Sequence, residues 1–161
     1  MSENWNNNGV RKAEISDAPQ ITSLINAAFR IAEEFFIDGN RITMLEVEQL
    51  FDSGVFLVRG DEAELNACIY VEPRGERSYF GLLSVNPSLQ KAGLGSMLIN
   101  AAEAYAKEGG ARFIDILSVN LLEDLPDFYG KRGYVMTGTS PLPDGLETKL
   151  PCHFVNMSKR L

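Results

Sequence analysis

The sequence predicts an α/β (α+β) fold in which helices cover both faces of one mixed, twisted sheet of about seven strands. Apolar periodicity gives the element order β-α-α-β-β-β-α-β-α-β-β along the chain. Three consecutive strands can run as hairpins and lead into a single β-α-β crossover, which argues against an all-parallel sheet and a sandwich. A chain of 161 residues fits one domain. We therefore expect residues 1–161 to form a single domain, with residues 1–9 as a flexible N-terminus.

The first half of the chain is predicted to hold two helices and four strands. Residues 10–15 alternate apolar and polar side chains, which is typical of a strand. Ser16 and Asp17 are good N-cap residues for a helix that runs toward Phe36 with apolar side chains at helical spacing. The other elements are a helix over residues 43–51 and strands over residues 55–60, 64–73 and 77–85.

The second half of the chain is predicted to alternate helices and strands. A helix begins at Gly93 and ends before the Gly109-Gly110 pair. The apolar run over residues 112–119 is typical of a buried strand. A loop over residues 139–151 is stiffened by three prolines but has no regular structure. The other elements are a short helix over residues 123–132 and strands over residues 134–138 and 152–161.

Composition limits the classes of partner. Apolar residues make up 45% of the chain, which is enough for a hydrophobic core. The net charge of −7 argues against a nucleic-acid partner and permits a cationic substrate. No apolar run approaches the roughly 20 residues that span a bilayer, so no membrane partner is expected. Cys68 and Cys152 form no C-x-x-C pair, so we expect neither a zinc site nor a redox pair. We also expect a cytoplasmic location, where cysteines stay reduced.

A glycine-containing loop, Gln90-Lys91-Ala92-Gly93-Leu94-Gly95, joins the strand over residues 77–85 to the next helix. The first N–H groups of a helix have no internal partner and carry the positive end of its dipole, so this junction favours an anion such as phosphate. The glycines let the backbone approach that anion closely. A Walker A loop would need a lysine after Gly95, and a Rossmann fingerprint would need a third glycine where Leu98 stands. Both features speak against ATP or NAD as the guest.

The loop fits the pattern [QR]-x-x-G-x-[GA] after a strand that ends in V-x-P, and in this it resembles the GNAT superfamily of N-acetyltransferases. Residues 128–138, FYGKRGYVMTG, resemble the tyrosine helix of that family and the strand after it. The order of elements is also similar, and the resemblance covers nearly the whole chain after about the first nine residues. It implies a mostly antiparallel sheet whose fourth and fifth strands splay apart, with the pantetheine arm of coenzyme A paired to the edge of the fourth strand.

The resemblance implies acetyl-CoA as the cosubstrate, held by its pyrophosphate at the loop, and no metal ion. Backbone N–H groups near Leu83 and Ser84 would stabilise the oxyanion that forms when an amine attacks the thioester. Asn120 could bond the pantetheine amide. Lys131 could reach the 3′-phosphate, although a lysine in the last turn of a helix also suits the helix dipole. The expected cofactor-binding residues are Leu83, Ser84, Val85, Gln90, Lys91, Ala92, Gly93, Leu94, Gly95, Ser96, Asn120 and Lys131.

Tyr129 matches the tyrosine that protonates the coenzyme A thiolate in the family, and a phenol with a pKa near ~10 stays protonated at neutral pH. The general base is open. His153, the only histidine, has an unperturbed pKa near ~6.5 that suits proton transfer, and it is the second expected catalytic residue. Glu33, Glu34 or a water chain are the alternatives.

The resemblance implies an N-acetyltransferase that moves an acetyl group from acetyl-CoA to a primary amine by direct transfer in a ternary complex. The acceptor would be a small-molecule or peptide amine. The alternative is a non-catalytic acyl-CoA-binding sensor of the same fold. The loop over residues 139–151 would border the acceptor pocket or form the contact of a possible homodimer.

Overall fold

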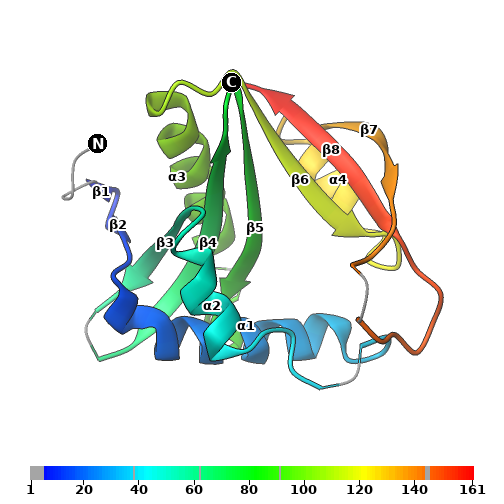
Figure 1. Ribbon diagram of the computed structural model, residues 1–161, viewed down its shortest axis with the longest axis horizontal. Helices are drawn as coiled ribbons and strands as arrows, with labels where there is room; N and C mark the ends of the chain where they lie inside the picture. Colours follow the sequence, from blue (N-terminus) through cyan, green and yellow to red (C-terminus); the bar gives the residue numbers. More distant parts are fainter. Residues whose placement is uncertain (1–5, 38, 62, 91, 144–145) are drawn as a thin grey trace.

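One eight-stranded sheet organises the chain, in the order β1-β2-β3-β4-β5-β6-β8-β7 (Figure 1). The computed structural model describes residues 6–37, 39–61, 63–90, 92–143 and 146–161. Neighbouring strands are antiparallel except β5 and β6, which are parallel, so the predicted mixed and mostly antiparallel sheet is confirmed. The strands are β1 (Asn6–Asn7), β2 (Val10–Lys12), β3 (Val55–Gly60), β4 (Leu65–Arg74), β5 (Arg77–Val85), β6 (Phe113–Val119), β7 (Val135–Ser140) and β8 (Phe154–Arg160).

The sheet has eight strands rather than about seven because residues before Val10 also pair. Asn6–Asn7 form β1, which runs antiparallel to β2, so two residues of the segment predicted to be flexible lie in a strand. The chain turns at Asn8 and Gly9, whose φ angles are 54° and 82°. Asparagine and glycine tolerate this left-handed region better than other residues, which permits the tight turn.

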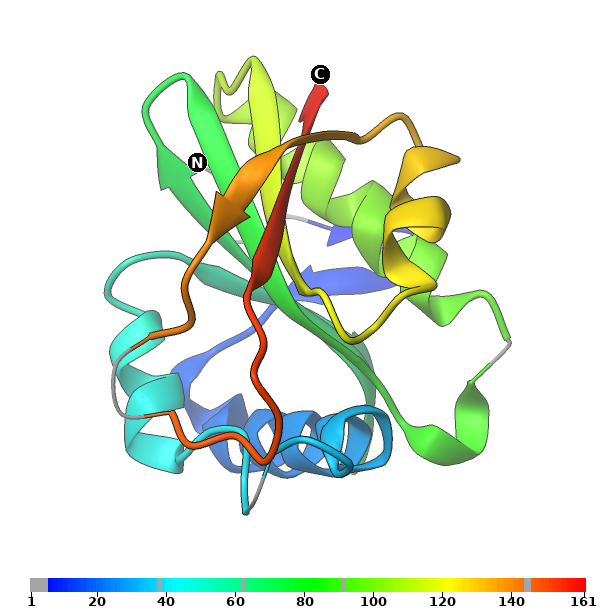
Figure 2. The same ribbon diagram turned by 90° about the vertical axis from the view of Figure 1, so that its right-hand side faces the viewer.

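Helices cover both faces of the sheet, as predicted (Figures 1 and 2). One apolar core lies between the sheet and α1 (Ala18–Glu33) with α2 (Met44–Leu50). A second core lies on the opposite face, under α3 (Leu94–Glu108) and α4 (Leu125–Gly130). Within the described ranges, no helix is both long and apolar enough to cross a bilayer.

Two boundaries in the N-terminal part differ from the prediction. The strand expected over residues 10–15 ends at Lys12, because Ile15–Asp17 form a 3₁₀ helix before α1. The helix expected to reach Phe36 ends at Glu33, whose carbonyl accepts hydrogen bonds from the N–H groups of Phe36 at 3.0 Å and Ile37 at 2.9 Å. The chain therefore turns directly after Glu33, and this turn fixes the end of α1 beside the sheet.

β5 and β6 pair at one end only, and they splay apart at the other (Figure 1). Their parallel register covers three residue pairs, from Arg77 with Phe113 to Tyr79 with Asp115. At the closed end the Arg77 guanidinium donates to both carboxylate oxygens of Asp115, at 2.8 and 2.6 Å, and lies over the Phe113 ring. A bidentate pair of this kind is geometrically specific, so it fixes the point from which the strands diverge. The predicted splay is confirmed.

A β-bulge bends β5 just beyond this point. Between the pairs Tyr70–Gly81 and Cys68–Ser84, β4 contributes one residue and β5 contributes two. Leu82 lies in the bulge and has a φ of 54°, which is rare for a residue with a side chain. Such a conformation costs of order 1–3 kcal/mol, and in folded proteins it concentrates at functional sites. The bulge turns the backbone of β5 away from the regular ladder at the mouth of the splay.

The close approach of Gly54 to β4 gives a test of the fold. A Cβ at Gly54 would collide with the carbonyl oxygen of Val71, a backbone atom that cannot move aside. We expect Gly54→Ala to lower the free energy of unfolding by about 1–3 kcal/mol, as overpacking does. Gly138→Ala is the matched control, because no heavy atom would lie within 4 Å of its Cβ. Urea denaturation would measure both, and equal stabilities of the two variants would contradict this packing.

Candidate active site

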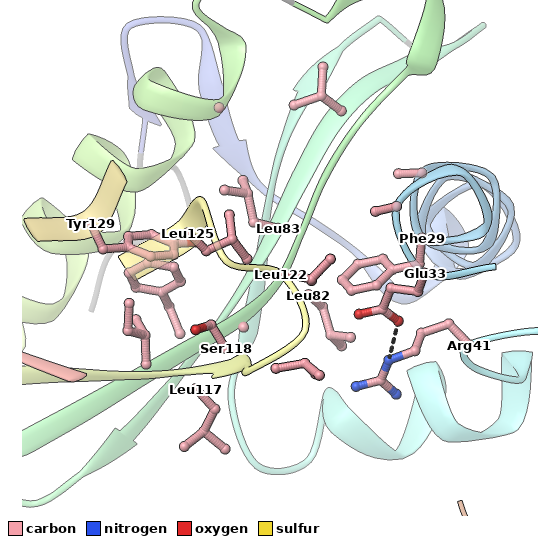
Figure 3. A pocket seen from close by; sticks show the side chains of 18 of the residues that line it. Phe29, Glu33, Arg41, Leu82, Leu83, Leu117, Ser118, Leu122, Leu125 and Tyr129 are labelled. Atoms are coloured by element: carbon pink, nitrogen blue, oxygen red, sulfur yellow. Dashed lines mark ion pairs between the residues drawn. The ribbon is translucent and has the colours of Figure 1, made fainter. Parts of the chain in front are cut away.

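A cavity of about 380 Å³ lies where β5 and β6 separate (Figure 3). Its walls come from β5, β6, the C-terminal half of α1, the start of α3 and α4. The lining is mostly apolar and contains a few polar groups, which is the usual composition of a site for a small molecule. The cavity therefore gathers segments that are far apart in the sequence.

The glycine loop forms one end of the cavity. Gln90, Gly93, Leu94 and Gly95 line it, as four of the predicted cofactor-binding residues. Gly93 is the N-cap of α3 with a φ of 80°. A Cβ at Gly93 or Gly95 would have no heavy atom within 4 Å, so both glycines leave space open in front of the first N–H groups of α3. This space can hold an anion. Lys91 lies outside the described residues.

The neighbouring predicted residues of the helix face elsewhere. Ala92 is exposed and does not line the cavity. The Ser96 hydroxyl accepts a hydrogen bond from Arg132 Nη1 at 3.3 Å, and Arg132 also donates to Asn100. Arg132 therefore ties the end of α4 to the first turns of α3, and the Ser96 side chain has a structural partner.

The edge of β5 forms the middle of the cavity. Leu83 and Val85 line it, together with Leu82 of the bulge. The Ser84 side chain points away, because its hydroxyl donates to the carbonyl of Leu82 at 3.1 Å and is 1% exposed. Only the backbone of Ser84 can serve the site. Beyond Tyr79 the β5 edge has no register with β6, so polar backbone groups on this edge are open to a ligand.

Tyr129 stands at the end of the cavity formed by α4, as predicted for the catalytic acid. Its ring packs against Tyr134, Phe128 and Phe80, with centroids 5.7, 5.2 and 6.1 Å away. Burial among these rings raises the pKa of Tyr129 to about 12. The phenol therefore stays protonated across the physiological range and can act as a proton donor.

Glu33 lies at the opposite end of the cavity, with Leu82 between it and Tyr129 (Figure 3). The Glu33 side chain is 5% exposed, and burial raises its pKa to about 7, although Arg41 opposes this shift. Arg41 Nε lies 3.7 Å from Glu33 Oε1, which is too far for a hydrogen bond. That buried carboxylate oxygen has no hydrogen-bond partner among the described residues. Glu33 is thus a carboxylate whose proton affinity is tuned to neutral pH.

Other predicted residues lie outside the cavity. The His153 side chain is exposed and does not line it. The backbone N–H of His153 donates to Asn120 Oδ1 at 2.8 Å, and the Asn120 N–H donates to the His153 carbonyl at 2.9 Å. This reciprocal pair fastens the end of β6 to the start of β8. Lys131 is exposed at the C-cap of α4, and Glu34 is exposed after α1.

Sequence reasoning did not single out three residues that shape the cavity. The Ser118 hydroxyl is buried and has no hydrogen-bond partner in the described part of the chain, although it points into the cavity (Figure 3). A serine in the apolar strand of residues 112–119 was a signal that could have indicated it. Arg41 carries no such signal, because a tertiary contact gives it its role, whereas Gly81 inside the strand pattern was a signal for the bulge at Leu82.

The described residues contain no group of three or more His, Cys, Asp and Glu side chains that could hold a metal ion. The polar groups of the cavity are instead a glycine cradle, an open strand edge, a phenol and a carboxylate. Such a set can bind an anion at one end and move protons at two points along an apolar channel.

Comparison with solved structures relates this fold to acetyltransferases. The PaiA N-acetyltransferase of Thermoplasma acidophilum in complex with coenzyme A aligns with 94% of this chain and 98% of its own, at a TM-score of 0.75 and 15% identity. The ribosomal-protein-alanine N-acetyltransferase of Brucella melitensis aligns with 94% of this chain and 99% of its own, at a TM-score of 0.75 and 16% identity. A GNAT family acetyltransferase of Elizabethkingia anophelis with acetyl-CoA bound aligns with 71% of this chain and 81% of its own, at a TM-score of 0.61 and 18% identity. At these identities the likeness shows a common fold.

Comparison with curated protein sequences gave no match. A family model does match, and its description is acetyltransferase (GNAT) family. The matched segment, residues 22–134, covers more than half of the chain and includes the glycine loop, the splayed strands, Glu33 and Tyr129. This chain therefore belongs to the acetyltransferase (GNAT) family.

Proposed function

We propose that this protein transfers an acetyl group from acetyl-CoA to a primary amine, directly and within a ternary complex. The observation that carries the proposal is the single cavity that joins the glycine cradle, the open edge of β5, Tyr129 and Glu33. An anion site, a rail for an extended chain, a proton donor and a proton acceptor are the parts that this transfer needs.

The cavity fits acetyl-CoA in three respects. The space in front of Gly93 and Gly95 suits the pyrophosphate, since a helix N-terminus favours anions. The β5 edge beyond Tyr79 offers backbone groups that can pair with the amides of the pantetheine arm. The Ser118 hydroxyl, which has no partner among the described residues, is a further polar group in the wall of the apolar channel. The coenzyme A and acetyl-CoA seen in two of the compared structures support this assignment.

Bound acetyl-CoA would supply the acetyl group as a thioester, so that the new amide C–N bond forms as the C–S bond breaks. Glu33 accepts a proton from the incoming ammonium group and so leaves a lone pair on the nitrogen. Backbone N–H groups at Leu83 and Ser84, next to the bulge, stabilise the negative charge on the carbonyl oxygen. Tyr129 provides the proton for the departing thiolate and regains one from the amine nitrogen. One proton is released overall.

Glu33 fits the role of base better than the other candidates. It lines the cavity, and a pKa of about 7 lets it be ionised at neutral pH while it still holds a proton well. His153 and Glu34 are exposed and do not line this cavity. Neither cysteine is needed as a nucleophile, because direct transfer forms no acyl-enzyme, and burial raises the pKa of the Cys68 thiol to about 12.

Gly95→Ala separates cofactor binding from folding. The new methyl group would point into the cradle and meet no protein atom, so the fold tolerates it, and alanine favours a helix over glycine. We expect an unchanged or higher melting temperature and an affinity for acetyl-CoA at least tenfold weaker by calorimetry. Gly138→Ala, far from the cradle, is the control. Undiminished affinity in Gly95→Ala would contradict the cradle.

Glu33→Gln tests the base through activity and stability together. Glu33 must be ionised to accept a proton, so wild-type kcat/KM should fall about tenfold per pH unit below about 7. The variant should lose roughly 10²-fold or more in rate and lose this pH dependence. Burial raises the pKa above the ordinary 4.5, so ionised Glu33 destabilises the fold above pH 7. The variant should therefore be more stable than the wild type at pH 8, where Glu33 is ionised, and should show no such gain at pH 4, where Glu33 is protonated.

The control for this experiment is Glu34→Gln, because Glu34 is the exposed neighbour of Glu33. We expect it to keep both the rate and the pH profile of the wild type. An unchanged profile in Glu33→Gln, or a lost one in Glu34→Gln, would remove Glu33 as the base.

Tyr129→Phe tests the acid. We expect kcat to fall by roughly 10²-fold with little change in acetyl-CoA affinity, because the ring still packs while the proton donor is gone. Tyr134→Phe is matched in chemistry but removes the hydrogen bond from Tyr134 Oη to Glu103, 2.8 Å long, outside the cavity. It should cost about 1 kcal/mol of stability and leave kcat near the wild-type value. If wild type binds acetyl-CoA but acetylates no amine in a broad screen, the protein is an acyl-CoA sensor and the proposal fails.

A further inference from the structure

Arg41 stands on the wall between the acetyl-transfer cavity and a second, more open cavity of about 520 Å³. The two cavities share Phe29, Glu33 and Arg41. None of the residues that line the second cavity belongs to the glycine loop, β5 or β6, so this cavity offers a route by which an acceptor reaches the base without crossing the cofactor channel. Any acceptor that uses this route passes the Arg41 guanidinium.

The Arg41 guanidinium is held at this wall but its donors are largely unused. Its Nε lies 3.7 Å from Glu33 Oε1, and its central carbon lies 5.6 Å from the centre of the Phe29 ring. Neither terminal nitrogen donates a hydrogen bond to any residue that the structure describes. Figure 3 shows these nitrogens below Glu33, on the cavity side of Arg41. A fixed guanidinium with an open fork matches a carboxylate in two-point geometry.

We infer that the acceptor is an α-amino acid with a free carboxylate: its ammonium group meets Glu33 and its carboxylate meets the terminal nitrogens of Arg41. This inference rests on the proposed acetyl transfer and names its substrate class. The geometry sets the spacing, because Glu33 Oε1 and Arg41 Nε are only 3.7 Å apart. The two groups of the acceptor must then lie on neighbouring atoms, as they do in an α-amino acid and do not in a long-chain ω-amino acid.

The charge of the cavity agrees with a zwitterion. Glu33 and Arg41 are the only charged side chains among the described residues that line the transfer cavity, and their charges are opposite. A polyamine would need several carboxylates, and a protein lysine or a peptide N-terminus has no free carboxylate beside its amine. Each of these acceptors would place a cation next to the Arg41 guanidinium without a carboxylate for its terminal nitrogens, which is unfavourable in a confined site.

The remaining lining selects the side chain of the acceptor. Phe29, Leu82, Leu117 and Phe154 are apolar and line the same cavity as the Glu33–Arg41 pair. Burial of a large aliphatic or aromatic side chain against such surfaces favours binding. Leucine, methionine and phenylalanine are therefore the acceptors to test.

The test compares matched acceptors by the rate of coenzyme A thiol release. Each amino acid is paired with its amide and with its decarboxylated amine, for example leucine, leucinamide and 3-methylbutylamine. We expect kcat/KM for leucine to exceed that for both partners at least tenfold. The amine of leucinamide is less basic than that of leucine and so has a larger neutral fraction at pH 7, which means that a preference for leucine over leucinamide cannot come from a larger supply of neutral amine.

Variants connect the preference to Arg41. Arg41→Gln should reduce the ratio of leucine to leucinamide to about one, and Arg41→Lys should restore only part of it, because lysine lacks the fork. The ratio is the readout, since loss of the Arg41 charge also affects Glu33 and so changes the rates of all acceptors. Arg112→Gln is the control, because Arg112 is exposed and pairs with Glu76 at 3.8 Å away from the cavity. It should keep the wild-type ratio.

The outcomes separate the two proposals. If amides and simple amines react as well as the amino acids, the inference is overturned while acetyl transfer stands. If nothing is acetylated by protein that binds acetyl-CoA, the proposed function fails, and calorimetry with N-acetylleucine on coenzyme A-saturated protein decides the inference. Binding that Arg41→Gln abolishes supports the carboxylate site, and no binding to the wild type overturns it. If Arg41→Gln does not fold, the inference is decided by the ratio of kcat/KM for leucine to that for leucinamide, measured in the wild type and in Arg41→Lys.

Discussion

The partial pairing of β5 with β6 is the constraint on which the rest of the structure depends. Three residue pairs and the Arg77–Asp115 ion pair hold the strands together at one end. If the ladder continued, it would close the cavity and satisfy the backbone edge that a ligand needs. The bulge at Leu82 lies where the strands have separated, and it takes the backbone of β5 out of the regular ladder. Helices on both faces then bring Tyr129 and Glu33 to the two ends of the gap.

The site is built from groups that a purely structural design would avoid. Ser118 Oγ and Glu33 Oε1 are buried without hydrogen-bond partners among the residues that the structure describes, and each such group costs roughly 1–3 kcal/mol. The same burial gives Glu33 a pKa of about 7 and keeps the Tyr129 phenol protonated. In the proposed reaction the destabilising features are thus the source of the chemistry, a common relation between stability and activity in enzymes. The large apolar cores on either side of the sheet offset their cost.

Local patterns in the sequence predict most of the fold, whereas the site depends on longer-range contacts. Hydrophobic periodicity locates the helices and strands, and the glycine loop indicates the anion site, because both are properties of short segments. The raised pKa of Glu33 arises from its burial in the folded chain, and Arg41, eight residues further on, opposes the shift, so spacing alone could not single Glu33 out among Glu33, Glu34 and His153. Gly81, inside a strand pattern and next to Leu82, was a local signal for the bulge, whereas the strand at Asn6–Asn7 is too short for a periodic signal.

The order of the strands has a consequence for how the protein is made. β8 lies between β6 and β7, although β7 is synthesised first. On the ribosome, β7 has no place on the sheet until residues 154–160 emerge and pair with Val119 and its neighbours in β6. Until then, β6 is joined to the nascent sheet through only three residue pairs with β5. The wall of the cavity that holds Phe154 is therefore completed last, and until then a shorter chain has an open edge at β6.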